Sequence, residues 1–166
     1  MLNAVSCQLV LCFTLLGFSL HVTAAEKADQ IIIKKSANIM VLQKEGKSLH
    51  SYKIALGSNP VGRKEKDGDG KTPEGVYTIT SKNLDSSYHI ELGISYPNEG
   101  DKKRAELAGV KPGGDISIHG QKTGLGGAAS VLQHFNWTNG SIAVSNAEIE
   151  EIAELVDTQT QVMILP

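Results

Sequence analysis

Ser141-Ile142-Ala143-Val144-Ser145-Asn146-Ala147-Glu148 is a stretch in which a short strand-like run passes directly into the start of a helix. Ser145 and Glu148 have the spacing of a capping box, in which the serine hydroxyl accepts a bond from the glutamate amide and the glutamate carboxylate returns to the serine amide. A helix over 146–156 is predicted because its apolar residues recur at spacings of three and four: Ile149, Ile152, Ala153 and Val156. The stretch therefore predicts a helix packed on a sheet and starting just after the strand that follows Ser141.

Short runs of β-branched and apolar residues, each bounded by turn residues, dominate the rest of the chain. The predicted strands are 30–34, 38–43, 51–56, 76–80, 89–92, 115–119, 141–144 and 161–165. Residues 44–47 have the composition of a hairpin turn, and the glycine-dense stretch 57–75 has that of a long loop. Further helices are predicted at 101–107 and 127–134. The sequence thus predicts a mostly β domain with a few helices, of the α+β class.

The N-terminal segment has the composition of a secretory signal peptide. Residues 1–25 contain no Lys, Arg, Asp or Glu, are almost wholly apolar from Leu9 to Leu20, and end on the small residues Thr23, Ala24 and Ala25. The apolar run is about a dozen residues, shorter than the roughly 20 that a membrane-spanning helix needs. We therefore expect a signal peptide over 1–25, secretion across the inner membrane to the periplasm, no stable membrane insertion, and one domain over 26–166.

Charge and cysteine content narrow the function classes. A formal net charge of −2 without a basic cluster argues against a nucleic-acid partner. Cys7 and Cys12 both fall inside the predicted signal peptide, so the mature part has no disulfide, thiolate metal site or cysteine nucleophile. The stretch beginning Asp67-Gly68-Asp69 resembles the start of a calcium loop but lacks the required glycine and glutamate further on. Neither a metal nor a cofactor is expected.

One histidine and one serine have an arrangement that fits acyl transfer. His119 ends a predicted strand, and Ser141 follows Gly140 at the turn that opens another strand 22 residues further on. Such a pair can meet in space while being distant in sequence. Gly140 can adopt a positive φ, which lets the turn aim two consecutive amides at one point as an oxyanion hole. From spacing alone, an ordinary turn serine and a hydrogen-bonded strand-end histidine remain the more frequent interpretation.

Three motifs follow one another in the chain: Lys71-Thr72-Pro73-Glu74-Gly75-Val76-Tyr77-Thr78-Ile79, Ile118-His119-Gly120 and Trp137-Thr138-Asn139-Gly140-Ser141-Ile142. They resemble the L,D-transpeptidase catalytic domain family of the YkuD type, with its Thr-Pro-X-Gly-X-Tyr/Phe-X-Ile strand entry and its histidine followed by Ser/Thr-X-Gly-Cys. Residues 92–98, 112–116 and 143–151 resemble the YafK-like branch more narrowly. The resemblance covers roughly 32–156 and implies a YkuD-like β-sandwich or barrel, in which strands 115–119 and 141–144 are neighbours and a helix follows the strand that carries the nucleophile position.

In that family a cysteine thiolate attacks the carbonyl of a diaminopimelate residue within a peptidoglycan stem peptide. The resemblance implies His119 as the general base, position 141 as the nucleophile, and the amides of Gly140 and residue 141 as oxyanion donors. It implies a substrate groove shaped by Thr72, Pro73, Tyr96, Gly120, Thr138 and Asn139. The implied partners are peptidoglycan stem peptides and, through the YafK-like branch, a peptidoglycan-linked lipoprotein, with cleavage favoured over cross-linking.

The chain departs from the family at position 141, where Ser141 stands in place of the cysteine. A thiol with a pKa of about 8.5 readily forms a thiolate, whereas a serine hydroxyl must lose its proton to a well-aligned base. Three interpretations stay open: an exported peptidoglycan-modifying acyl transferase that uses Ser141, a catalytically inactive peptidoglycan-binding pseudoenzyme, and an engineered substitution. An active serine needs His119 within about 3 Å of its hydroxyl and a carbonyl or carboxylate on the other ring nitrogen.

Overall fold

The computed structural model describes residues 26–124 and 131–166 of the chain. The predicted signal peptide, and residues 127–130 of the helix predicted at 127–134, lie outside these residues. In the described part of the chain, no helix is both long and apolar enough to cross a membrane.

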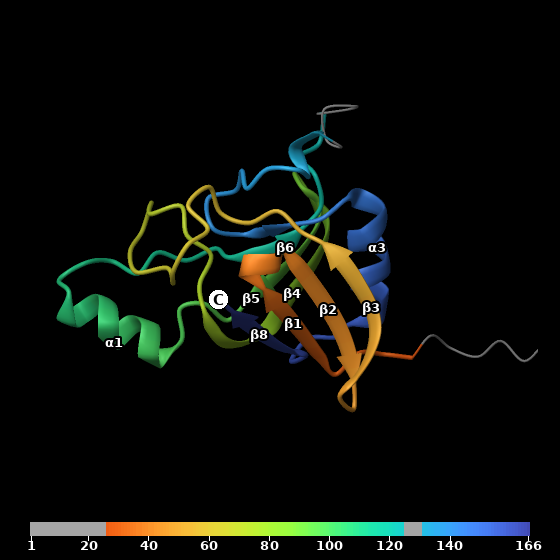
Figure 1. The fold of residues 1–166 in the computed structure, drawn as a ribbon, viewed down its shortest axis with the longest axis horizontal. Helices are drawn as coiled ribbons and strands as arrows, with labels where there is room; N and C mark the ends of the chain where they lie inside the picture. The colour runs from red at the N-terminus through yellow and green to blue at the C-terminus, as the bar shows by residue number, and fades with distance from the viewer. Residues whose placement is uncertain (1–25, 125–130) are drawn as a thin grey trace, which may run out of the picture.

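The described strands form one mixed sheet in the order β3-β2-β1-β8-β4-β5-β6-β7 (Figure 1). Their bounds are β1 Gln30–Lys34, β2 Ile39–Lys44, β3 Lys47–Lys53, β4 Gly75–Ser86, β5 His89–Ile94, β6 Ser117–His119, β7 Ile142–Ala143 and β8 Gln161–Leu165. The pairs β1–β8 and β6–β7 are parallel, and the other neighbours are antiparallel. The expectation of a mostly β domain with a few helices is confirmed.

The first and last strands of this order, β3 and β7, are connected, because the segment that follows β3 pairs with β7. Ala55 and Ala143 form an antiparallel bridge, in which each amide donates to the carbonyl of the other residue at 2.9 Å. Gly57 and Thr138 form a second, parallel bridge beside the first. We call this junction of residues 55–58 with residues 138–143 the seam. It closes the sheet toward a barrel.

The core lies between the sheet and the helix α3, Asn146–Leu155. Alternate residues of the strands point inward, as Ile31 and Ile33 of β1 do, and α3 adds Ile149 and Ile152, all of them buried. Helix α3 packs against β5, whereas α1, Glu99–Leu107, lies on the other side of the molecule in Figure 1. The predicted packing of the helix after the Ser141 strand, which is α3, on the sheet is confirmed.

Local boundaries differ from the predicted ones for identifiable reasons. The hairpin turn takes only Glu45 and Gly46, both at positive φ, so β3 begins earlier than predicted. Helix α3 ends at Leu155 because Val156 is extended. Strand β6 begins at Ser117, since Asp115 has a φ of 54° and breaks the predicted strand. Strand β7 has two residues, so Ser141 lies just before the strand and not in it.

Candidate functional site

A cavity of about 700 Å³ lies where the β3–β4 loop (residues 54–74), β5, β6 and the turn before β7 meet. Four predicted site residues line it: His119, Thr138, Asn139 and Ser141. Strands β6 and β7 pair in parallel, with Ile118 opposite Ile142, and this pairing brings the end of β6 beside the residue that precedes β7. The predicted proximity of the two strands is confirmed.

The side chain of His119 is buried, and one of its two ring nitrogens forms a hydrogen bond with the backbone. Its Nδ1 lies 2.7 Å from the carbonyl oxygen of Gly120, and a carbonyl can only accept, so Nδ1 carries the hydrogen. In the neutral ring Nε2 is then the proton acceptor. The imidazole packs against Tyr88, with ring centroids 4.5 Å apart, and edge-on against Trp137. These contacts fix the plane of the ring.

The environment of His119 favours the neutral imidazole. Burial lowers the pKa of His119 below its ordinary value, because a charged ring loses its hydration there. The hydrogen bond to Gly120 and the carboxylate of Glu91, which pairs with His119 across the β5–β6 ladder, act in the opposite direction and only reduce this shift. A neutral imidazole with a free Nε2 is the form that a general base requires.

The hydroxyl of Ser141 is held by the start of β6. Its Oγ accepts a hydrogen bond from the Ser117 amide at 3.2 Å, and it lies 3.5 Å from the Ser117 hydroxyl and from the Asp115 carbonyl. Within the described residues, no hydrogen bond joins Ser141 to His119. The orienting carbonyl of an acyl-transfer pair is thus in place, but the contact between base and hydroxyl is not.

Gly140 has the backbone that the sequence suggested, but its amide is already used. Its φ is +127°, and a Cβ added there would lie 2.6 Å from the carbonyl oxygen of Lys71. The Gly140 amide donates to Thr138 Oγ1 at 3.1 Å, and the Thr138 hydroxyl donates to the Ser141 carbonyl at 2.6 Å. The Ser141 amide has no acceptor among the described residues. Of the two expected oxyanion donors, one is therefore available without rearrangement.

The other predicted groove residues lie behind the cavity and do not line it. Thr72 and Pro73 are buried, and Thr72 Oγ1 accepts the Gly57 amide at 3.0 Å. Tyr96 is in the core, where its hydroxyl donates to the Pro112 carbonyl at 2.9 Å. Gly120 is buried, and a Cβ there would lie 2.7 Å from Asn146 Oδ1. None of these four residues lines the cavity.

Several lining residues were not singled out from the sequence. Ser117 could have been found, because residues two apart in a strand share a face and Ser117 therefore points to the same side as His119. Glu91, Tyr88 and Lys122 also line the cavity. No short-range pattern marks these three, because the folded ladder and the adjoining loops bring them together.

Charged stretches such as 63–66 are usually solvated, but Lys64 is an exception. Its side chain is buried, lines the cavity and pairs with Asp69 at 2.8 Å. Burial raises the pKa of Asp69, but the bond from Lys64 and three backbone amides outweigh it and lower the pKa to about 2. Asp69 therefore organises the loop as an internal acceptor. Within residues 26–124 and 131–166, no cluster of three or more His, Cys, Asp or Glu could hold a metal.

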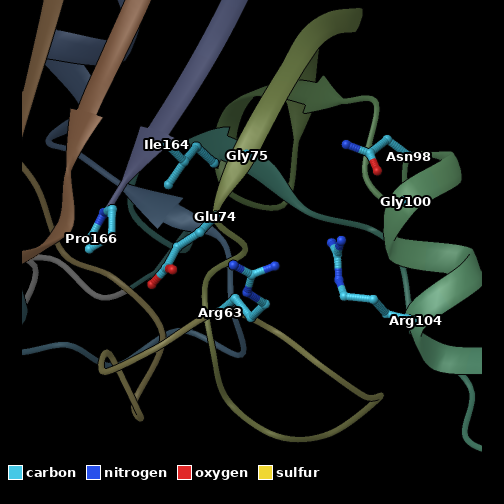
Figure 2. A pocket seen from close by; sticks show the side chains of 8 residues that line it. All are labelled: Arg63, Glu74, Gly75, Asn98, Gly100, Arg104, Ile164 and Pro166. Atoms are coloured by element: carbon cyan, nitrogen blue, oxygen red, sulfur yellow. The ribbon is translucent and has the colours of Figure 1, made fainter. Parts of the chain in front are cut away.

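A second hollow, of about 440 Å³, contains none of the predicted site residues (Figure 2). Arg63 and Glu74 reach it from the β3–β4 loop, and Arg104 reaches it from α1. Two of these charged side chains are already paired, Glu74 with Lys35 and Arg104 with Asp101. The histidine and hydroxyl needed for acyl transfer lie in the first cavity.

The order and contacts of these motifs agree with a comparison to known families. Residues 28–164 match the model of the YkuD family, described as the L,D-transpeptidase catalytic domain. The chain belongs to the L,D-transpeptidase catalytic domain family. The match covers nearly all of the described residues and includes the cavity.

Individual relatives of the family support the same assignment. The chain is 31% identical over 110 residues to "Putative L,D-transpeptidase YafK" of Escherichia coli (strain K12), which covers 65% of this chain and 37% of that protein. Among solved structures, the helical cell shape determining protein Pgp2 of Campylobacter jejuni is 26% identical with a TM-score of 0.63, covering 84% of this chain and 48% of Pgp2. Bd1075 of Bdellovibrio bacteriovorus, 21% identical with a TM-score of 0.60, covers 87% and 50% and shares the fold. The chain thus spans half or less of each relative.

Proposed function

We propose that this chain is an exported member of the L,D-transpeptidase family that binds diaminopimelate-containing peptidoglycan stem peptides in the cavity around His119 and Ser141, without turning them over. The observation that carries the proposal is the position of the Ser141 hydroxyl, which accepts a bond from the Ser117 amide and makes none with His119. The family match and the likeness to YafK and to a cell shape determining protein support the substrate class. The composition of residues 1–25 supports export to the periplasm.

Chemistry supports binding over turnover at this site. A serine hydroxyl becomes a nucleophile only as a base removes its proton during attack, and that base must already be aligned. Replacing sulfur by oxygen at one atom changes the shape of a peptide cavity little, while it removes the thiolate on which the reaction depends. A protein with Ser141 therefore keeps the binding contribution and loses most of the rate. A lipoprotein joined to the stem peptide would bind in the same way.

Titration of the protein with a diaminopimelate-containing tetrapeptide, followed by NMR or calorimetry, tests this proposal. A short peptide in an open cavity immobilises several rotors, so we expect a dissociation constant of about 0.1 to 1 mM. Gly140→Val should abolish binding, because the added side chain meets the Lys71 carbonyl and the backbone has a positive φ. His119→Ala should weaken binding less. No shift of any cavity resonance at millimolar peptide would reject the proposal.

A second function, acyl transfer by Ser141 itself, is favoured by one observation: the bond between His119 Nδ1 and the Gly120 carbonyl, which leaves Nε2 free to accept a proton. If the Ser141 side chain turned toward Nε2, its Oγ would attack the peptide carbonyl and His119 would take the proton. The amide of Ser141 would stabilise the oxyanion, and His119 would return the proton to the leaving amine as the peptide C–N bond breaks, which leaves the acyl group as an ester on Ser141. Water or an acceptor amine would then attack this ester and free the Ser141 hydroxyl. Hydrogen bonds of this kind often form only with substrate bound.

Mass spectrometry separates the two functions. A serine nucleophile predicts a covalent peptide adduct on Ser141 or release of the leaving amino acid, and both should be absent in Ser141→Ala. Binding alone predicts an unmodified protein after prolonged incubation, with the same affinity in Ser141→Ala as in the parent within about threefold.

A further inference from the structure

We propose that the buried ammonium group of Lys35 is a positioning element for the Ser141 turn, acting through the β3–β4 loop and the seam. Lys35 lies in the short 3-10 helix Lys35–Ala37, directly after β1. It does not line the cavity of His119 and Ser141. Its effect on stem-peptide binding rests on the proposed function, whereas its effect on the geometry of the turn can be measured without any ligand.

The first step is the contact of Lys35 with the loop. Its Nζ donates to the Gly62 carbonyl at 2.6 Å, to the Thr72 carbonyl at 2.9 Å and to Glu74 Oε1 at 2.8 Å. An ammonium group has three donors, so every one is used. The side chain of Lys35 is 2% exposed and that of Glu74 is 13% exposed. A buried charge of this kind stays only where its partners stay, so Lys35 fixes both ends of the segment 62–74.

Figure 2 shows the carboxylate side of this contact. Glu74 lies at the entry to β4, and Arg63 from the same loop faces the same hollow. The structure describes an ion pair of Glu74 with Lys35 but none with Arg63. The charge of Glu74 is therefore directed to the interior lysine, which ties the start of β4 to the end of β1.

The second step leads from Thr72 to the seam. Thr72, whose backbone Lys35 holds, accepts the Gly57 amide on its Oγ1 at 3.0 Å. On either side of Gly57, the Ser58 amide donates to the Thr138 carbonyl and the Thr138 amide donates to the Leu56 carbonyl. Gly57 has no room to move toward Gly70, since a Cβ there would lie 2.2 Å from the Gly70 carbonyl oxygen.

The third step reaches the serine. The Lys71 carbonyl lies close to Gly140, where a Cβ would be only 2.6 Å away, and a Cβ on Gly57 would lie 3.1 Å from the Gly140 Cα. Gly140 and Thr138 hold the backbone of Ser141 through the Thr138 hydroxyl. The backbones of 57, 70–72 and 140 are thus packed without intervening side chains, so a shift of Thr72 is transmitted to the turn.

Residue-resolved hydrogen exchange on the full chain tests the relay, with Lys35→Met as the variant. The amides of Gly57 and Gly140 should exchange at least about tenfold faster than in the parent, while the α3 amides Ile149 and Val156 keep their rates. A merely structural role for Lys35 would instead raise all slow amides by one common factor. The affinity for the stem peptide should fall in the variant whose Gly57 and Gly140 amides exchange faster. If the peptide does not bind the parent, the exchange rates still test the relay, because they are measured without ligand.

Lys82→Met is the matched control. Lys82 of β4 also donates its ammonium to two backbone carbonyls, those of Ala153 and Val156, but at the end of α3 and away from the seam. Its loss should accelerate Val156 and leave Gly57 and Gly140 unchanged. The same pattern in both lysine variants would overturn the proposal.

Glu74→Gln serves if Lys35→Met does not fold, because it keeps the shape and removes only the charge partner of Lys35. It should accelerate Gly57 and Gly140 about threefold with Lys35 still present. Thr72→Val, which removes the acceptor of the Gly57 amide and leaves the Lys35 contacts, should accelerate both amides as well. Unchanged exchange at Gly140 in Glu74→Gln and Thr72→Val would reject the relay.

Discussion

The oxygen of Ser141 and the ring of His119 lie in one cavity, but each is satisfied by the backbone of β6 or by the residue that follows it. Ser141 Oγ takes the Ser117 amide, and His119 Nδ1 donates to the Gly120 carbonyl. Acyl transfer would have to bring the serine hydrogen, whose acceptor at 3.5 Å is the Asp115 carbonyl, to His119 Nε2. At the scale of single residues, the chemistry of the site therefore depends on the atom at position 141 and on the charge of one imidazole.

Ser141→Cys is expected to create a reactive thiol. A neutral His119 can take the thiol proton, and a thiol pKa lowered by one or two units from 8.5 raises the thiolate fraction at neutral pH by about tenfold. Alkylation at position 141 of the mature protein should be faster than alkylation of the same thiol in an unfolded cysteine peptide by that factor, read by mass spectrometry. Turnover of a diaminopimelate tetrapeptide should appear with it.

Ser141→Cys combined with His119→Ala is the control for this prediction. It should lose the acceleration while keeping the fold. A thiol at position 141 that reacts no faster in the single variant than in the unfolded peptide would show that the site has lost more than its sulfur.

His119 should make the protein less stable as the pH falls through the range below neutral. Its folded pKa is lowered by burial, so below about pH 6.5 the unfolded chain binds a proton that the folded chain does not. The free energy of unfolding then decreases with falling pH until the folded pKa is reached. Thermal unfolding between about pH 6.5 and pH 5 should show a steeper loss of Tm in the parent than in His119→Gln. An equal dependence of Tm on pH in the two proteins would contradict a lowered pKa of His119 in the folded state.

At the scale of elements, a capping box within its own sequence fixes the start of α3, and this start limits the position of β7 just before it. The Ser145 hydroxyl accepts the Glu148 amide, and the Glu148 carboxylate accepts the Ser145 amide at 2.8 Å. The helix begins at Asn146, three residues after Ala143 of β7, which pairs with His119 of β6. A cap that stays formed therefore limits how far β7 can shift relative to His119.

Ser145→Ala should destabilise the protein by about 1 kcal/mol, because it removes the N-cap acceptor and leaves the Glu148 amide without a partner. Urea unfolding followed by circular dichroism measures the change. The exposed Ser48 of β3 offers a comparison, and Ser48→Ala should stay within about 0.5 kcal/mol of the parent. Equal effects of the two substitutions would mean that the capping box contributes nothing to stability.

At the scale of the whole molecule, the site lies at the seam. The cavity walls come from both ends of the strand order, with the β3–β4 loop on one side and β5 and β6 on the other. The tightest backbone packing in this region involves Gly57, Gly70 and Gly140. Binding and stability are therefore expected to respond together to changes in volume there.

Gly57→Ala should destabilise the fold by about 1–3 kcal/mol and weaken peptide binding, since its Cβ would overlap the Gly70 carbonyl and crowd the Gly140 Cα. Thermal unfolding and peptide titration measure the two effects. For stability, Gly114→Ala is the comparison, because a Cβ there meets nothing within 4 Å. A Gly57→Ala protein as stable as the parent would show that the loop can retreat from the seam.

Sequence patterns predicted most of the strands and α3, because these depend on periodicity and caps, and the family resemblance placed His119 and Ser141 in one cavity. They could not predict the burial of Lys35 and Lys64. A lysine in a polar loop has the pattern of a solvated residue, and it is buried here only because acceptors distant in sequence converge on Lys35 and because Asp69 folds back on Lys64. Nor could spacing show that Ser141 bonds to Ser117, since the rotation of one side chain decides this.

The closure of the sheet also protects the protein from self-association. Strand β7 ends the strand order, and its residues Ile142 and Ala143 are apolar and fully buried. Without the bridge from Ala55, β7 would present unpaired amides and carbonyls on an apolar strand, which is the kind of edge that recruits a strand from another molecule. Substitutions that open this junction should therefore promote intermolecular β-pairing, starting at the strand beside Ser141.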